Sequence, residues 1–153
     1  MSHPPPTEAM IDLHGAAAAR LRTIGHRYTA KRRALVEVFE LADQPLSMPE
    51  VLARNGELAQ SSVYRNLGVL ELAGVLHRIL TQDEFARFEL AEELSGHHHH
   101  HLICSSCGSV EDMELPPTVE ATVTEELARL AERRGFAPSG HQMDLVGVCA
   151  DCR

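Results

Sequence analysis

The N-terminal half of the chain carries the apolar spacing of short helices, interrupted by glycine, proline and serine residues. The spacing predicts four helices, over residues 14–24, 30–41, 48–55 and 61–73. Thr29 and Ser47 precede the second and third of these, and both are residue types that cap helix N-termini. Gly25, Gly56 and Gly74 stand where the first, third and fourth helices are expected to end.

The pattern changes to that of β-strands after Gly74. Residues 75–80 (VLHRIL) and 85–90 (FARFEL) are short β-type runs on either side of TQDE, and they predict a hairpin. Helices followed by a hairpin describe a winged helix-turn-helix, whose second helix enters the DNA major groove. A generic small helical domain has the same periodicity, so the pattern alone leaves that alternative open.

The remaining chain has the pattern of a small α/β domain. Residues 91–96 (AEELSG) predict an acidic hinge, and the segments that follow predict a strand, a second strand, a helix and a third strand, over residues 97–104, 109–115, 116–135 and 141–149. A domain this small is marginal alone, so we expect metal and dimerisation to complete it.

The predicted fold class is therefore α+β, with a winged helix-turn-helix followed by a small α/β dimerisation domain. The expected divisions are a disordered proline-rich leader, a DNA-binding domain, a hinge and a metal-binding dimerisation domain, over residues 1–13, 14–90, 91–97 and 98–153.

Composition excludes some classes of protein. Hydrophobic residues make up 44% of the chain, enough for a packed core, whereas aromatic residues make up 4%, too few for base stacking to dominate. The sequence has neither a run of 18 apolar residues nor a signal-like N-terminus, so we expect a cytoplasmic protein without a membrane partner.

The net charge of −8 is opposite to that of a typical DNA-binding protein, but its distribution is uneven. Residues 1–90 hold 10 basic and 11 acidic side chains, whereas residues 91–153 hold 4 and 11. Six basic residues and no acidic one lie within residues 20–33: Arg20, Arg22, Arg27, Lys31, Arg32 and Arg33. Such a local basic face can bind phosphate, although a solvated helix face is the commoner role of a charge cluster.

All four cysteines lie in two CxxC pairs, Cys104 with Cys107 and Cys149 with Cys152, separated by 41 residues. Two such pairs can supply four thiolates to one tetrahedral Zn²⁺. A closed shell of four sulfurs is typical of a structural site. A redox dithiol and disulfides are the alternatives. A reducing cytosol disfavours disulfides, and two CxxC pairs with a strand, a helix and a strand between them favour metal over a redox dithiol.

Five consecutive histidines precede the first CxxC pair, over residues 97–101. Alternate residues of a strand face opposite sides, so His98 and His100 share one face while His99 and His101 share the other. One strand could therefore contribute ligands to two metal sites. An exposed polar strand edge with unspecific metal affinity is the alternative, and the internal position of the run argues against an expression tag.

Each of these sites needs further ligands from elsewhere in the chain. The available imidazoles and carboxylates are those of His77, Glu89, Asp112, Glu120 and His141. Imidazole with carboxylate suits zinc, iron, manganese, nickel or cobalt, so the ligand types do not select one metal.

Four blocks of sequence together resemble the ferric uptake regulator family. They are SSVYRNL in the fourth predicted helix, ARFEL in the hairpin, HHHHHLIC followed by SSCG, and the terminal GVCADC. The likeness covers residues 16–153. It implies a homodimer that binds palindromic double-stranded operator DNA when its sensing metal is present, and thereby represses transcription.

The resemblance also implies roles for individual residues. The structural zinc would be held by Cys104, Cys107, Cys149 and Cys152, and a dimer-domain metal by His98, His100, Glu120 and His141. A hinge sensory site would take Glu89, His99 and His101, with Asp112 added in six-coordinate members. DNA contacts would come from Arg27, Arg32, Ser61, Tyr64 and Arg65.

Two departures from the family pattern bear on the sensed metal. Iron- and peroxide-sensing members supply a histidine before the third helix, where this chain has Pro45, and zinc-sensing members often supply a cysteine that residues 91–96 lack. His77 stands where zinc sensors place a carboxylate, so the predicted sensory set is His77, Glu89, His99 and His101. Four mixed ligands favour Zn²⁺, and participation of Asp112 would favour Fe²⁺ or Mn²⁺.

The predicted function is a metal-dependent transcriptional repressor of metal homeostasis genes, responsive to zinc or iron. A peroxide-sensing repressor of the same family is the alternative, disfavoured because peroxide sensors prefer aspartate at the position of Glu89. A zinc enzyme is a weaker alternative, because the chain has no HExxH motif and its cysteine site is predicted to be closed. A metal-storage protein would explain neither SSVYRNL nor the basic segment.

Overall fold

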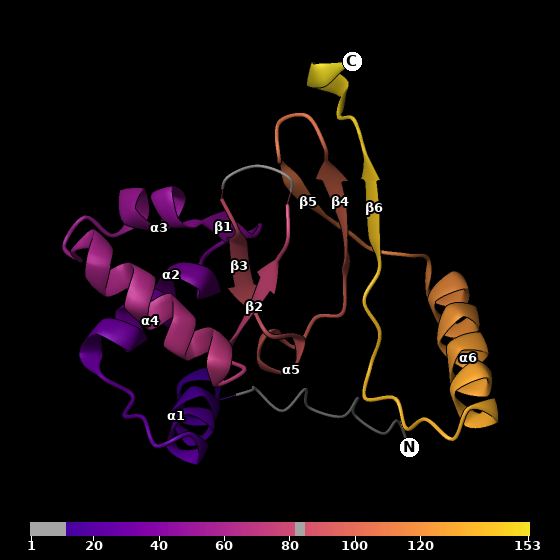
Figure 1. The fold of residues 1–153 in the computed structure, drawn as a ribbon, viewed down its shortest axis with the longest axis horizontal. Helices are drawn as coiled ribbons and strands as arrows, with labels where there is room; N and C mark the ends of the chain where they lie inside the picture. The colour runs from indigo at the N-terminus through magenta and orange to yellow at the C-terminus, as the bar shows by residue number, and fades with distance from the viewer. Residues whose placement is uncertain (1–11, 82–84) are drawn as a thin grey trace, which may run out of the picture. The chain divides into compact units, whose positions relative to one another are not determined.

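A computed structural model describes residues 12–81 and 85–153. The predicted leader up to residue 11, and most of the hairpin turn, lie outside the described residues. The chain divides into two compact units (Figure 1). The N-terminal unit comprises Met1–Ile79 and Ala86–His97, and the C-terminal unit comprises Leu80–Phe85 and His98–Arg153.

The N-terminal unit contains the four predicted helices, α1 (Leu13–Thr23), α2 (Ala30–Glu40), α3 (Met48–Arg54) and α4 (Gln60–Leu72). The caps follow the sequence: the Thr29 hydroxyl accepts a hydrogen bond from the Arg32 N–H at 3.4 Å. At α3, Glu50 accepts from the Ser47 N–H at 2.7 Å. The α4 helix begins one residue before the predicted Ser61–Ser62 start, so Ser61 lies in its first turn.

A three-stranded sheet follows, in the order β1 (Leu46–Ser47), β3 (Arg87–Leu90), β2 (Leu76–Ile79), with both pairings antiparallel. The β2–β3 hairpin is the predicted wing. Two short elements were not predicted from the sequence. Leu46 and Ser47, between the second and third predicted helices, pair with β3 as β1. The predicted acidic hinge contains a single helical turn, α5 (Glu92–Ser95).

The core of the N-terminal unit is built from the apolar faces of these helices. Leu21, Leu35, Val36, Val63 and Leu70 are fully buried. The Arg32 Nε donates to the side-chain Oδ1 of Asn66 at 3.0 Å and joins α2 to α4 beside this core. Core packing and the Arg32–Asn66 hydrogen bond thus hold α4 against α2, with the other face of α4 exposed.

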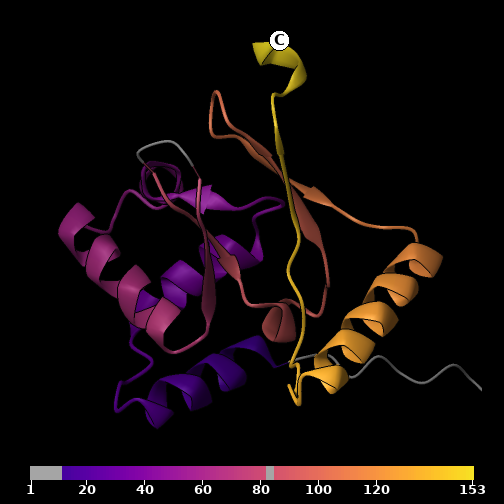
Figure 2. The ribbon, with the colours of Figure 1, turned by 45° about the vertical axis from the view of Figure 1, so that its right-hand side comes forward.

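The C-terminal unit consists of β4 (His100–Cys104), β5 (Val110–Met113), α6 (Pro117–Arg133), β6 (Asp144–Gly147) and a short 3₁₀ turn, η1 (Ala150–Cys152). The sheet order is β5–β4–β6, and β4 pairs antiparallel with β5 and parallel with β6. The chain passes through α6 between β5 and β6, as Figure 2 shows.

This unit buries little apolar surface of its own. All four residues of β6 are exposed, and α6 buries only Ala131 among its own residues. Large apolar side chains are exposed on both elements and just after β6: Val119, Leu127, Leu130, Leu145, Val146 and Val148. In the part of the chain that the structure describes, no helix is both long and apolar enough to cross a membrane.

Two leucines of α4 provide a matched test of the core. Leu70 is fully buried, whereas Leu72 is 71% exposed. Leu70→Ala should lower the free energy of unfolding by about 2–5 kcal/mol, because it removes buried methyl groups and leaves a cavity. Leu72→Ala should change it by less than about 0.5 kcal/mol. Urea unfolding of the full chain, followed by circular dichroism, measures both, and equal losses would contradict the described packing of α4.

Candidate metal centres

The four cysteines converge at one end of the β5–β4–β6 sheet. Cys104 is the last residue of β4, Cys107 lies in the turn after it, and Cys149 and Cys152 flank η1 beyond β6. The parallel pairing of β4 with β6 brings the two CxxC pairs together, because Cys104 lies in register with Gly147. The four Sγ atoms all lie within 4.8 Å of one another.

Neighbouring groups favour the ionised form at two of these sulfurs. The backbone N–H groups of Cys149 and Cys107, which donate to the Cys104 Sγ at 3.3 and 3.5 Å, lower the pKa of Cys104 to about 6. The hydroxyl and backbone of Ser109 lower the pKa of Cys107. Thiolate is the form that binds metal, so the lowered pKa values of Cys104 and Cys107 favour metal binding at this end of the sheet.

The thiol of Cys152 has the opposite tendency: its pKa is raised. The Ser106 hydroxyl lowers the pKa of Cys152, but the neighbouring thiols of Cys149 and Cys107 outweigh it and raise that pKa to about 12. Four sulfurs this close cannot all ionise without a compensating cation. A tetrahedral Zn²⁺ would supply that charge, so the donor set fits a closed structural zinc site.

A second cluster combines three imidazoles with one carboxylate. Glu120, in the first turn of α6, contacts the Nε2 atoms of His98 at 3.1 Å, His100 at 2.9 Å and His141 at 2.9 Å. His100 is 1% exposed. Its hydrogen bond lowers the pKa of Glu120, so this carboxylate stays ionised below the usual range for glutamate.

Two buried nitrogens of this cluster lack hydrogen-bond partners. Within the described residues, the Nδ1 of His100 and the Nε2 of His141 are buried and unsatisfied. The His141 nitrogen lies close to Glu120 without the geometry of a hydrogen bond. Buried polar atoms normally have partners, and a metal ion bound by these groups would satisfy them. The residues present therefore fit a divalent metal.

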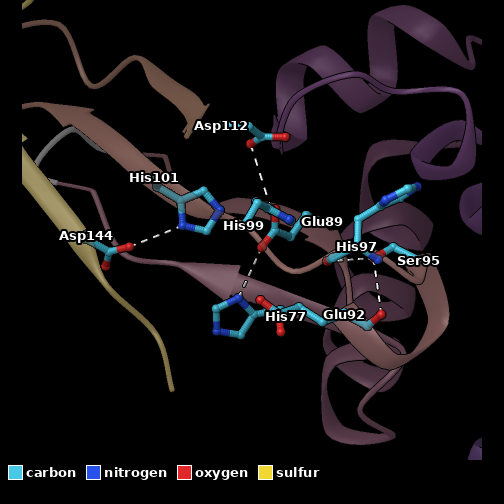
Figure 3. Close-up of polar contacts among 9 residues, drawn as sticks. All are labelled: His77, Glu89, Glu92, Ser95, His97, His99, His101, Asp112 and Asp144. Atoms are coloured by element: carbon cyan, nitrogen blue, oxygen red, sulfur yellow. Dashed lines mark hydrogen bonds and ion pairs between the residues drawn. The ribbon is translucent and has the colours of Figure 1, made fainter. Parts of the chain in front are cut away.

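A third group lies on the opposite face of β4. The His99 Nε2 is 3.9 Å from the Asp112 carboxylate, and the rings of His99 and His101 meet edge to face at 5.0 Å. The His101 Nδ1 is 3.1 Å from an oxygen of Asp144 (Figure 3). His99, His101 and Asp112 each present a ligand atom within 4.8 Å of the others.

The other two predicted sensory residues form a pair in the N-terminal unit. His77 on β2 lies in register with Glu89 on β3, and the His77 Nδ1 is 3.5 Å from the Glu89 carboxylate (Figure 3). Each predicted sensory residue therefore lies beside another of the set in its own unit. That the two groups share one ion stays a prediction.

The histidine run divides between two faces as expected from strand alternation: His98 lies against His100, and His99 lies against His101. The β4 strand begins at His100, so His98 and His99 precede it, yet each turns to the same side as its partner two residues later. His97 lies outside both groups and donates its backbone N–H to the Ser95 hydroxyl at 3.3 Å. Sequence reasoning missed Asp144, because only the β4–β6 register places it beside His101.

The predicted DNA-binding residues occupy one part of the N-terminal unit. Tyr64 is 71% exposed, Ser61 and Arg65 are also exposed, and these three line an open hollow with Met48 and Gln60. Arg27 is exposed. Arg32 is half-buried, and its guanidinium donates to the Arg27 carbonyl at 2.6 Å as well as to Asn66.

Comparison with known proteins agrees with these features. The profile described as the ferric uptake regulator family matches residues 23–146. The ferric uptake regulation proteins of Bordetella parapertussis and Cupriavidus metallidurans are 32% and 35% identical, over 88% of this chain and 95% and 93% of theirs. The solved structure of the ferric uptake regulator from Pseudomonas aeruginosa with manganese matches with a TM-score of 0.68 and 26% identity, covering 86% of this chain and 96% of that one.

Removing one sulfur tests the cysteine site. Cys104→Ser should abolish zinc retention and unfold the C-terminal unit, because the remaining core of that unit is small. Asp151→Asn is the control, since it changes an exposed side chain between Cys149 and Cys152 without removing a ligand. Zinc content by mass spectrometry, circular dichroism and size-exclusion chromatography report the result. A folded Cys104→Ser protein without zinc would refute the structural role.

Proposed function

Because the chain belongs to the ferric uptake regulator family, we propose that it is a metal-dependent repressor that binds operator DNA as a homodimer and controls metal homeostasis genes. The observation that carries the proposal is the presence, in one chain, of an exposed Tyr64–Arg65 face on a helix of a winged-helix unit and of three groups of metal-ligand residues. The first binds DNA, and the second makes binding depend on metal.

The N-terminal unit would dock with α4 in the major groove. Support comes from the exposure of Ser61, Tyr64 and Arg65, which line one hollow of the α4 surface. Tyr64 would contact base edges and Arg65 a phosphate. Arg27 would reach the backbone or the minor groove, and Arg32 would assist by holding the Arg27 carbonyl and α4 in position.

The C-terminal unit would form the homodimer. Support comes from the large apolar side chains exposed on β6 and α6, a surface that monomeric proteins normally bury. The structural zinc, held by the four cysteines, would fix β6 against β4 and keep this surface in shape. The group of His98, His100, Glu120 and His141 would hold a second metal near the start of α6.

The regulatory metal would bind where both units contribute ligands, with His77 and Glu89 from one and His99, His101 and Asp112 from the other. Their imidazole and carboxylate groups suit Zn²⁺, which four of them would satisfy, and also Fe²⁺ or Mn²⁺ if Asp112 takes part. We favour Zn²⁺. The relative from Pseudomonas aeruginosa was solved with manganese, which keeps that ion among the candidates.

The metal would act by fixing the orientation of the DNA-binding units in the dimer. A dimeric helix-turn-helix protein reads two half-sites whose spacing must match the distance between its recognition helices. An ion with ligands in both units binds the matching arrangement more tightly than others, and this difference in affinity is what shifts the population. Loss of the metal would release the operator.

Metal-dependent DNA binding is the direct test of this function. With the promoter region of the protein's own gene, under anaerobic metal-buffered conditions, the regulatory metal should tighten binding about 5- to 150-fold. Zinc, iron, manganese, nickel and cobalt are compared one by one, by fluorescence anisotropy. Equal affinity with and without every metal would exclude the proposal. Release of DNA by peroxide from the iron-loaded protein would instead indicate a peroxide sensor.

Paired variants connect that response to the ligands. His99→Ala combined with His101→Ala should remove the metal response while structural zinc and basal DNA binding remain. His97→Ala, in the same histidine run, is the control and should respond as the wild type does. A full response in the double variant would show that the regulatory ion binds elsewhere.

Two substitutions on α4 separate phosphate contact from base contact. Arg65→Ala should weaken binding similarly for all sequences and reduce the dependence of log K on log salt concentration by about 1. Tyr64→Ala should reduce the preference for operator over random DNA instead. Arg134→Ala, an exposed arginine after α6, is the control. An unchanged salt dependence in Arg65→Ala would place that residue outside the DNA contact.

A further inference from the structure

His101 occupies the central strand of the C-terminal sheet and has an acidic residue in register on each side. Asp112 on β5 and Asp144 on β6 both pair with it across the backbone ladders. Register partners point to the same face of a sheet, so the three side chains meet on one surface. Between the His101 Nδ1 and an Asp144 oxygen the distance is 3.1 Å, which is that of a hydrogen bond.

This contact determines which nitrogen of His101 can bind metal. A neutral imidazole has one N–H group and one nitrogen with a free lone pair. An ionised carboxylate only accepts hydrogen bonds, so the nitrogen facing Asp144 must carry the hydrogen. The lone pair is then on Nε2. In Figure 3 that second nitrogen lies on the side of the ring toward His99.

Burial holds the ring in this orientation. The His101 side chain is 8% exposed, whereas the Asp144 side chain is 45% exposed. The edge-to-face contact with the His99 ring restricts the imidazole further. Asp144 is itself placed by the parallel pairing of β6 with β4, at whose end the two cysteine pairs lie close together. The hydrogen-bond acceptor is thus fixed by the backbone and does not depend on a flexible loop.

We propose that Asp144 is a positioning residue for the regulatory metal: it fixes the tautomer of His101 so that Nε2 is presented as the ligand atom. The inference rests on the proposed function in one respect, that His101 is a ligand of the regulatory metal. A carboxylate that accepts a hydrogen bond from one nitrogen of a ligand histidine also makes the other nitrogen more basic, and therefore a stronger metal ligand. Loss of such a partner typically lowers metal affinity 10- to 100-fold, on the order seen for outer carboxylates in other metal sites.

Three variants separate this role from a general electrostatic one. Asp144→Ala removes the acceptor. Asp144→Asn removes the charge but keeps an oxygen that can accept from Nδ1–H. Glu111→Ala is the matched control, because Glu111 is an exposed acidic residue of the same sheet that pairs with Leu102 on the opposite face. All are made in the full chain, with the structural zinc retained and verified.

Two measurements are made on each variant. Long-range ¹H–¹⁵N spectra of the imidazoles, with the His101 signals identified by their loss in His101→Gln, report the tautomer in protein without regulatory metal. Competition with a chelator in zinc buffers reports affinity for Zn²⁺ beyond the structural ion. We expect wild type, Asp144→Asn and Glu111→Ala to show Nδ1–H at His101. Asp144→Ala should lose that preference and bind Zn²⁺ about 10- to 100-fold more weakly, with Asp144→Asn in between.

The outcomes that overturn the proposal are distinct. If Asp144→Ala keeps the Nδ1–H tautomer, Asp144 does not position the ring, even if affinity falls. If the tautomer changes and affinity does not, the position of the hydrogen has no role in metal binding. If the wild type takes up no regulatory metal although its tautomer is as expected, the proposed function fails while the structural assignment of the hydrogen bond stands.

Discussion

The repulsion among four converging cysteine sulfurs is the constraint on which the C-terminal unit depends. Nearby N–H groups lower the pKa of Cys104, whereas the neighbouring thiols raise the pKa of Cys152. A bound dication would allow all four thiols to ionise, because its charge offsets the repulsion between thiolates. The ion would close a segment of 41 residues between the two CxxC pairs, which the few buried side chains of this unit do little to order. Folding of the unit and binding of the proposed zinc would therefore be one equilibrium.

The geometry of the other candidate sites in this unit would depend on the ion bound by the two CxxC pairs. All four residues of β6 are exposed, so β6 gains little from burial. Its register on β4 is set by backbone pairing, which zinc bound by the cysteines would reinforce. That register places Asp144 beside His101, and the segment leading into β6 brings His141 to Glu120. The proposed structural ion would thus influence groups that it does not contact, through the alignment of β4 and β6.

Much of this arrangement could be predicted from the sequence, because its signals are local. Helix caps at Thr29 and Ser47, the hairpin runs after Gly74 and the spacing of the cysteines each depend on neighbouring residues. The two-residue β1 and the single turn of α5 could not be predicted, since both are too short to show a period. The partner of His101 depends on a parallel pairing across 43 positions, and no local pattern encodes such a register.

The length of the histidine run has a consequence for how such a protein can change over generations. In an alternating strand, a shift of one position exchanges the two faces and would normally destroy both sites. Here a shifted strand could still offer imidazoles on either side, because His97 stands next to the four histidines of the two proposed sites. A slip that brings His97–His100 to the positions of His98–His101 would still place an imidazole at each of the four. The unassigned histidine would thus make the proposed metal sites tolerant of such a slip.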